Sequence, residues 1–414
     1  MFKKIRSMKK CNFIQLLYRK KTNKNLHSKT FGFVCAADPF NDRVAWSGTF
    51  YKIREAIQNA GFNVVWIPVK KNGIIELCYK FFLTVYEVLF CKRKKIMSGS
   101  NRPFIAKLRG RAIRQDDAYK SCDAFFFSGG AGGAQLSLFM DLLGKPSIFY
   151  TDATFQIMCG YYWHNLSEKE KNESIDLEKR GVNKATLNIM ASQWALDSII
   201  NDYGFNPQKS FVLEFGANID SSDIVPNVPY ISGSLNIFFS GVDWIRKGGD
   251  VAVETVQYLR NTGIDAHLII AGVKEIPEKY KHYEFIQCVG FLNKNNLESY
   301  KKYIECWKKS HLLLLPTQAE CSAIVYSEAA GFGVPVYTYL TGGTGNYVVD
   351  GINGRTFAPK TQASAIAKKI KEDIDTGYFK SFHESALNLY KTKLSWAAWS
   401  KRFKKIIEET NFFS

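Results

Sequence analysis

Apolar residues along this chain fall into short, nearly continuous runs that are separated by longer stretches with helical spacing. The second half has the more regular pattern. Five apolar runs there predict strands at residues 236–240, 267–271, 285–289, 311–316 and 334–338. Helical stretches lie between them, at residues 249–261, 296–309 and 321–331. Fully apolar strands that alternate with helices predict a parallel sheet with helices on both faces.

The first half repeats this pattern less regularly. Its predicted strands lie at residues 31–36, 63–69, 123–127, 146–150, 185–191 and 210–214. A helix predicted at 50–60 ends at Gly61, a common helix stop. Residues 215–235 are rich in Pro, Ser, Asn and Asp, which is typical of an interdomain linker. The sequence therefore predicts an α/β protein with a first domain at residues 1–222 and a second at 223–394.

The loops that follow strands carry the candidate chemistry, because ligands of open parallel sheets bind at the carboxyl ends of the strands. The loop after residues 236–240 reads GVDWIRKGGD. Gly241 allows a tight turn, and Arg246 and Lys247 bring two cations to the start of a helix, where the backbone itself is partly positive. These residues form a candidate seat for a diphosphate, or else a solvated basic loop.

Two further loops add polar groups at strand ends. The stretch TQAECSAIVYSEAAGFGVPV holds Glu320 and Glu328, which could accept hydrogen bonds from two sugars or simply be charges on a helix surface. The stretch YLTGGTGNYV follows the last predicted strand, and its exposed N–H groups and hydroxyls form either an anion cradle or an ordinary turn.

These three loops, in this order, resemble the glycosyl transferases group 1, which are retaining enzymes of the GT-B fold. The resemblance covers about residues 235–357. It implies two Rossmann-like parallel-sheet domains facing a cleft, with a C-terminal helix at residues 395–414 that crosses back to the first domain. Trp396 and Trp399 of that helix are then packing residues.

The resemblance also implies roles for site residues. Arg246 and Lys247 lie where the family grips the donor diphosphate, in the loop that begins at Gly241. Glu320 lies where the family contacts the hydroxyls of the donor sugar, and Glu328 where it holds the ribose. The residues expected near the phosphates and the sugar are Gly342, Gly343 and Thr344. Two departures stand out: Val242 replaces a frequent basic residue, and the usual E-G-F-G is here ECSA.

The first domain resembles the family more weakly. Ser47, Gly48 and Thr49 lie where the family has a loop near the acceptor and the donor phosphates. Asp152 follows a predicted strand, at a place where many members have a histidine that faces the sugar. The residues alone leave Asp152 either as a catalytic group or as a helix N-cap. The stretch SGGAGG at 128–133 is interpreted as a close-packed turn.

Charge is concentrated in the first third of the chain. Residues 1–120 contain 26 Lys and Arg but 7 Asp and Glu, a net charge of +19, whereas the whole chain carries +18. Such a basic region predicts an anionic partner. The segment YKFFLTVYEVLFCKRKK joins aromatic residues to Lys92, Arg93, Lys94 and Lys95. It indicates either attachment to an anionic membrane surface or a solvated basic face. No nucleic-acid motif accompanies the charge, so no nucleic-acid partner is expected.

The remaining composition bears on location and cofactors. Nine cysteines without zinc-site spacing favour a reducing compartment. The basic start has no signal-peptide cleavage site, and no apolar run approaches the roughly 20 residues of a membrane span. No D-x-D motif lies near a predicted strand end, so we expect no metal and no cofactor besides the donor substrate. We expect a cytoplasmic protein, peripheral on the inner face of the cytoplasmic membrane.

The combined prediction is a retaining, nucleotide-sugar-dependent glycosyltransferase (a hexosyltransferase) that acts on a glycan or lipid-linked acceptor in the synthesis of cell-surface polysaccharide or lipopolysaccharide. Two alternatives stay open. One is a nucleotide-sugar epimerase of the same fold, and the other is a non-enzymatic basic protein that binds membrane or nucleic acid.

Overall fold

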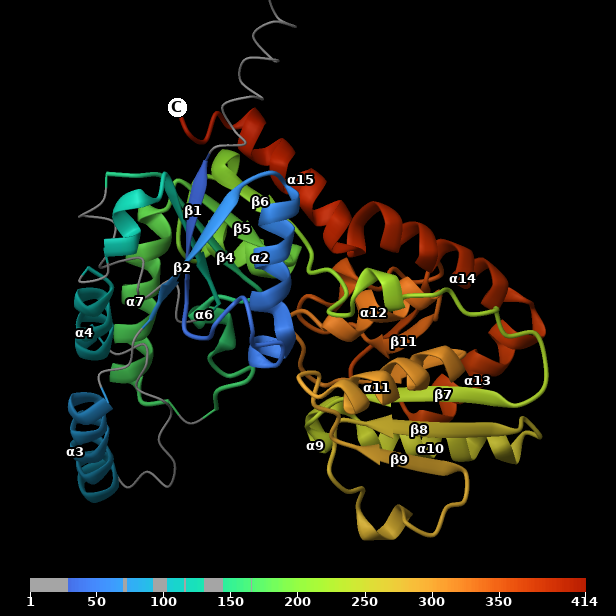
Figure 1. The fold of residues 1–414 in the computed structure, drawn as a ribbon. Coiled ribbons are helices and arrows are strands. Elements are labelled where there is room, and N and C mark those ends of the chain that lie inside the picture. Colours follow the sequence, from blue (N-terminus) through green and yellow to red (C-terminus); the bar gives the residue numbers. More distant parts are fainter. Residues whose placement is uncertain (1–28, 70–72, 92–102, 115–116, 130–143, 165) are drawn as a thin grey trace, which may run out of the picture.

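The computed structural model describes residues 29–414 except 70–72, 92–102, 115–116, 130–143 and 165 (Figure 1). Its described strands form two six-stranded sheets, with the orders β2-β1-β3-β4-β5-β6 and β12-β11-β10-β7-β8-β9. The neighbouring strands in both sheets pair in parallel. This confirms the predicted pair of Rossmann-like domains.

The first sheet is buried on both faces. Its strands are β1 (Thr30–Cys35), β2 (Asn63–Pro68), β3 (Ala124–Ser128), β4 (Ser147–Thr151), β5 (Leu187–Met190) and β6 (Ser210–Val212). Its helices are α2 (Thr49–Asn59), α3 (Gly73–Cys91), α4 (Pro103–Arg114), α6 (Phe155–Met158), α7 (Glu168–Lys184) and α8 (Gln193–Asn201). In β3, Phe126 enters a core shared with α2, whereas Phe125 and Phe127 enter the core under α7 and α8. Alternate side chains thus meet two cores, which explains the continuous apolar run.

The second sheet is built around one large core. Its strands are β7 (Leu235–Ser240), β8 (Ala266–Ala271), β9 (Ile286–Gly290), β10 (Leu312–Leu315), β11 (Val336–Tyr339) and β12 (Gly354–Phe357). Its helices are α9 (Trp244–Lys247), α10 (Gly249–Asn261), α11 (Leu297–Lys309), α12 (Ile324–Phe332), α13 (Ala363–Asp375) and α14 (Tyr378–Leu389). All four leucines of β10 are fully buried in this core, so the central strand fixes the position of the loop that follows it.

The last helix, α15 (Trp396–Glu409), crosses from the second domain to the first, as predicted (Figure 1). Ser395 caps it by accepting a hydrogen bond from the Ala398 N–H. Trp399 is fully buried and donates its indole N–H to the Tyr150 hydroxyl at 3.0 Å. Trp396 is also buried against the first-domain core, so both tryptophans pack rather than line a site.

Candidate active site

The first candidate loop joins β7 to α10 and is shaped by glycines. Gly248 has a φ of +78°, and a Cβ there would lie 2.2 Å from the Pro316 carbonyl oxygen. Glycine is therefore required for this loop to contact the loop after β10. Asp243 caps the short helix α9 by accepting the Arg246 N–H at 3.0 Å, which fixes the direction of the two cations that follow.

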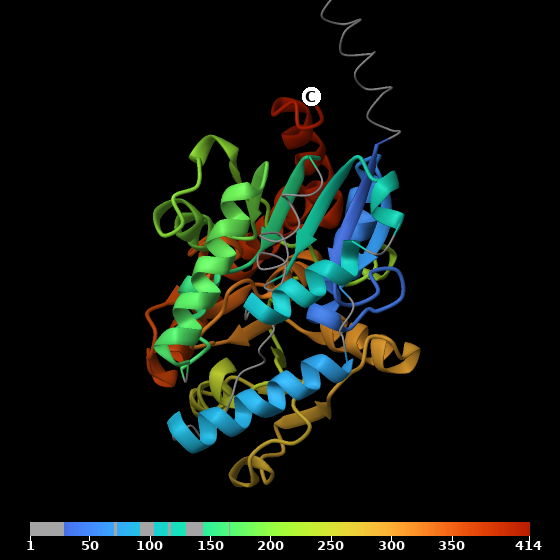
Figure 2. The same ribbon diagram turned by 90° about the vertical axis from the view of Figure 1, so that its left-hand side faces the viewer.

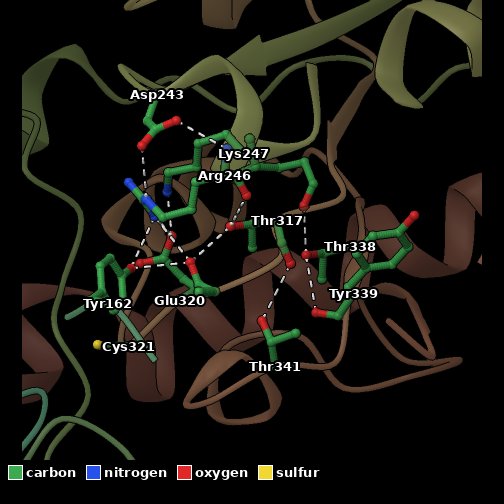
Figure 3. A network of polar contacts seen from close by, with 12 residues as sticks. Tyr162, Asp243, Arg246, Lys247, Thr317, Glu320, Cys321, Thr338, Tyr339 and Thr341 are labelled. Atoms are coloured by element: carbon green, nitrogen blue, oxygen red, sulfur yellow. Dashed lines mark hydrogen bonds and ion pairs between the residues drawn. The ribbon is translucent and has the colours of Figure 1, made fainter. Parts of the chain in front are cut away.

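Those cations converge on Glu320 (Figure 3). The Lys247 ammonium hydrogen-bonds the Glu320 carboxylate, and the Arg246 guanidinium lies 3.8 Å from the same oxygen. Lys247 and Glu320 are only 9% and 7% exposed. The Arg246 guanidinium also lies 3.6 Å from the Asp243 carboxylate, so two cations and two carboxylates meet in this partly buried place. An anionic ligand would compete with the carboxylates for the two cations.

The third loop closes over Glu320 from the end of β11. Gly342 has a φ of +50°, and a Cβ there would lie 2.2 Å from the Glu320 carbonyl oxygen. The Gly343 N–H donates to that same oxygen at 3.2 Å. The Thr344 hydroxyl accepts the Thr341 N–H, so it holds the turn together rather than pointing outward.

The three loops follow β7, β10 and β11, which are neighbours in the second sheet. The predicted donor residues therefore lie at one sheet edge. The structure brings together Gly241, Arg246, Lys247, Glu320, Gly342, Gly343 and Thr344. Val242, which departs from the family pattern, is exposed.

Glu328 has separate partners. It lies on α12, is almost fully buried, and accepts hydrogen bonds from Lys294 at 2.7 Å and from the Tyr303 hydroxyl at 2.5 Å. Burial, aided by the charge of Glu328, holds the pKa of Tyr303 well above its usual range, so that hydroxyl stays a donor. Lys294 was not predicted as a site residue. It lies in the loop after β9, at the same sheet edge as the other candidate loops, and this position was the signal that could have identified it.

The predicted loop Ser47–Thr49 is strained and tied to the interdomain segment. Ser47 and Gly48 have φ angles of +59° and +86°. The Asn218 side chain donates to the Ser47 carbonyl at 2.8 Å and to the Thr49 hydroxyl at 3.0 Å. A small recess here is lined by Arg43, Gly48, Tyr51, Lys52, Asn218, Lys294 and Tyr300. Through Lys294, this loop is next to Glu328.

Asp152 directly follows β4 in the first domain. The residue that caps α6 is Thr154, whose side chain accepts the Ile157 N–H, so Asp152 is not the N-cap of that helix. Burial raises the pKa of Asp152 to about 7, and the charge of Glu320 adds to the shift. A carboxyl group that titrates near neutrality beside Glu320 can exchange a proton under ordinary conditions.

Two tyrosines that the sequence did not single out bring the first domain onto this cluster. The Tyr162 hydroxyl accepts a hydrogen bond from Arg246 at 3.0 Å and donates to the Ala319 carbonyl at 3.1 Å (Figure 3). The Arg246 guanidinium also lies over the Tyr162 ring, 4.9 Å from its centroid. Tyr161 bonds the Glu320 backbone. The available signal was two adjacent aromatic hydroxyls in a loop soon after Asp152.

In the part of the chain that the structure describes, no three His, Cys, Asp or Glu side chains are grouped so as to hold a metal ion. No described helix is long and apolar enough to cross a bilayer. The predicted cluster at Lys92–Lys95, and all but the first two residues of SGGAGG, lie outside the described residues.

Comparisons with known proteins agree with this architecture. The family profile of the glycosyl transferases group 1 matches residues 229–386. The uncharacterized glycosyltransferase MJ1178 of Methanocaldococcus jannaschii is 23% identical over 181 residues, 44% of this chain and 50% of that protein. The chain thus aligns with about half the length of that curated relative.

Solved structures share the fold over nearly the whole chain. A glycosyltransferase from Rickettsia africae superposes with a TM-score of 0.64 at 17% identity, over 93% of this chain and 99% of that one. Anabaena Alr3699/HepE, solved in complex with UDP and glucose, gives 0.61 at 14% identity, over 92% and 100%. The second domain therefore matches the glycosyl transferases group 1 over residues 229–386, and the chain as a whole has the GT-B fold of these solved glycosyltransferases.

Proposed function

We propose that the chain transfers a sugar from a nucleoside diphosphate sugar to a hydroxyl of a glycan or lipid-linked acceptor, with retention of the anomeric configuration. The observation that carries the proposal is the convergence of Arg246 and Lys247 on the carboxylate of Glu320 at the edge of the second sheet.

The donor diphosphate is the ligand that suits the two cations. Fixed positive groups stabilise the negative charge that develops as a diphosphate leaves, and they do so best where water is excluded. When the diphosphate binds, Arg246 and Lys247 replace some of their contacts with Glu320 by contacts with the phosphates. The Glu320 carboxylate is then free to accept hydrogen bonds from the hydroxyls of the donor sugar. UDP in the complex of the Anabaena protein of the same fold supports this class of donor.

The nucleoside is assigned to the neighbouring group. Lys294 and Tyr303 hold the Glu328 carboxylate in one orientation, from which it accepts hydrogen bonds from the ribose hydroxyls. The recess beside Gly48 and Lys294 adjoins this position, which fits a loop that contacts donor phosphates or acceptor.

Asp152 supplies a carboxylate from the opposite domain. Once ionised, it stabilises the positive charge that develops on the sugar ring as the diphosphate departs. Because its pKa is about 7, this contribution depends on pH in the physiological range. The reaction requires no metal or other cofactor in this proposal, since the cations of the first loop take the role that a metal has elsewhere.

The proposed setting is the inner face of the cytoplasmic membrane, in the synthesis of cell-surface polysaccharide or lipopolysaccharide. The net charge of +19 in residues 1–120 supports an anionic surface as partner. Each Lys or Arg near such a leaflet contributes about 1 kcal/mol.

A thermal-shift screen of nucleoside diphosphates and their sugars tests the donor. A ligand at about 100 times its Kd stabilises the protein by roughly 2.7 kcal/mol, so a true donor raises the Tm clearly. Lys247→Ala should reduce the shift strongly, and Lys368→Ala, a change at an exposed lysine on α13, should leave it unchanged. If no nucleoside diphosphate raises the Tm, the proposal is wrong. Conversion of the sugar nucleotide to an epimer without acceptor would instead support the epimerase.

A further inference from the structure

The helix α3 carries an unusual apolar surface. It lies at the outer edge of the first domain in both views (Figures 1 and 2). Nine of its described large hydrophobic side chains are exposed, namely Ile74, Ile75, Leu77, Phe81, Phe82, Val85, Tyr86, Val88 and Leu89. At about 100° per residue, all nine point into one half of the helix circumference. Monomeric soluble proteins rarely expose an apolar patch of this extent, so the surface calls for an apolar partner.

The opposite half of α3 fastens it to the domain. Glu76 is buried and accepts two hydrogen bonds from the Arg109 guanidinium of α4, at 2.9 and 2.8 Å. The Tyr79 ring stacks on Phe104 of α4, with 4.8 Å between the ring centroids. A bidentate pair of this kind fixes orientation. The apolar half of α3 therefore faces outward because the opposite half is attached to α4 by these contacts. The exposed apolar half is thus a feature of the fold and not a misplaced core face.

The charge around α3 indicates what covers it. Lys107 on the adjoining α4 is exposed, and four consecutive basic residues, Lys92–Lys95, directly follow α3 in the sequence. A second copy of this chain would bring two regions of net charge +19 together, which is unfavourable. The partner that fits an apolar helix face with basic residues beside it is apolar inside and negatively charged at its surface. An anionic lipid bilayer has both properties.

We propose that the outward half of α3 inserts into the boundary between headgroups and acyl chains of an anionic bilayer, with the helix axis parallel to the surface. Apolar residues on one half and polar contacts on the other are the properties of a helix that lies in this boundary. This inference rests on the proposed function, because the inserted helix holds the active-site cleft next to a lipid-linked acceptor. Membrane binding by inserted apolar side chains differs from attachment by charge alone, because salt does not weaken it.

Co-sedimentation of the full chain with vesicles tests the insertion. The vesicles contain phosphatidylcholine alone or with about 30% phosphatidylglycerol, since anionic lipid should be required for tight binding. The test variant changes Leu77, Phe82 and Leu89 to Ser. The matched control changes Val228 and Ile231, which are 78% and 80% exposed in the segment before β7, to Ser.

We expect the α3 variant to bind anionic vesicles about tenfold more weakly than wild type, and the control to bind as wild type does. Wild-type binding should persist in part at about 0.5 M NaCl, where charge attraction is largely screened. Unchanged binding by the α3 variant, or no binding by wild type, would overturn the proposal. So would a variant that loses an oligomeric state while its vesicle binding is unaltered.

The Tm shift with nucleoside diphosphate separates this inference from the proposed function. The α3 variant should keep the wild-type shift, because α3 is remote in the fold from the donor loops. A wild-type protein that binds vesicles but no nucleotide would contradict the proposed function and leave the insertion intact.

Discussion

The Tyr161 hydroxyl of the first domain hydrogen-bonds both backbone groups of Glu320 in the second, accepting from its N–H at 2.7 Å and donating to its carbonyl at 3.3 Å. One phenol thus links the two domains at the centre of the candidate donor site. Burial raises the pKa of Tyr161, so the hydroxyl keeps the proton that it donates.

Replacement of Tyr161 by Phe should loosen this link. Each bond is worth about 1 kcal/mol net, so we expect a loss of roughly 1–2 kcal/mol in the free energy of unfolding. Turnover should fall more than donor affinity, because the Glu320 loop loses its fixed position. Urea unfolding and steady-state kinetics measure both. Tyr258→Phe, at an exposed tyrosine of α10, is the control, and a Tyr161→Phe enzyme with normal turnover would refute the positioning role.

Lys247→Ala should lower turnover by about 10²–10³-fold, the loss observed when one fixed group that stabilises a developing negative charge is removed. Binding of the nucleoside diphosphate should weaken, and binding of the nucleoside without phosphates should not. Isothermal titration with both ligands makes this comparison. An equal loss for the two would indicate general damage to the loop, since the Glu320 carboxylate loses its buried partner.

Glu320 and Glu328 should have different functions. Glu328→Ala should weaken binding of the free nucleoside diphosphate, because the ribose is its proposed target. Glu320→Ala should leave that binding unchanged and reduce sugar transfer. Titration calorimetry and a transfer assay on both variants provide the test, and normal nucleoside diphosphate binding by the Glu328 variant would exclude the ribose role.

Activity should rise with pH through about 7 as Asp152 ionises. Asp152→Asn should remove this limb of the pH–rate profile and lower the plateau. Stability should change in the opposite sense. The pKa of the folded state is raised above its ordinary value of 3.8, so ionisation destabilises the fold increasingly as pH rises from about 4 to 7. The Asn variant should therefore gain more stability over wild type at pH 8 than at pH 5. An unchanged pH–rate profile would remove Asp152 from the mechanism.

A metal chelator should leave turnover unchanged, because Arg246 and Lys247 supply the positive charge at the proposed diphosphate position. The assay compares initial rates with and without the chelator. Loss of turnover that magnesium or manganese restores would contradict this prediction.

Sequence patterns predicted the strands well because most of them are buried on both faces. β10 is an unbroken run of leucines that no exposed helix would carry. β12 was missed because it is short, polar and only partly buried. The donor loops could be predicted to converge, since β7, β10 and β11 end at one edge of the sheet.

The contacts between domains could not be predicted in this way. Tyr162 and Arg246 are 84 positions apart and belong to different domains, so no local periodicity relates them. Lys294 pairs with Glu328 only because β9 and α12 are folded around the same core. Whether Asp152 caps a helix depended on where α6 begins, and short helices have the least predictable ends.

The crossing of α15 has a consequence for the order in which the protein can fold during synthesis. Phe31, near the start of the first sheet, packs against Phe403 and Phe412, with ring centroids 5.8 and 5.9 Å apart. The ribosome makes β1 before the second domain, but it makes the side chains of α15 that cover Phe31 only after the second domain. The first domain can therefore complete its core only after the second domain has been made, and its apolar face is exposed until then.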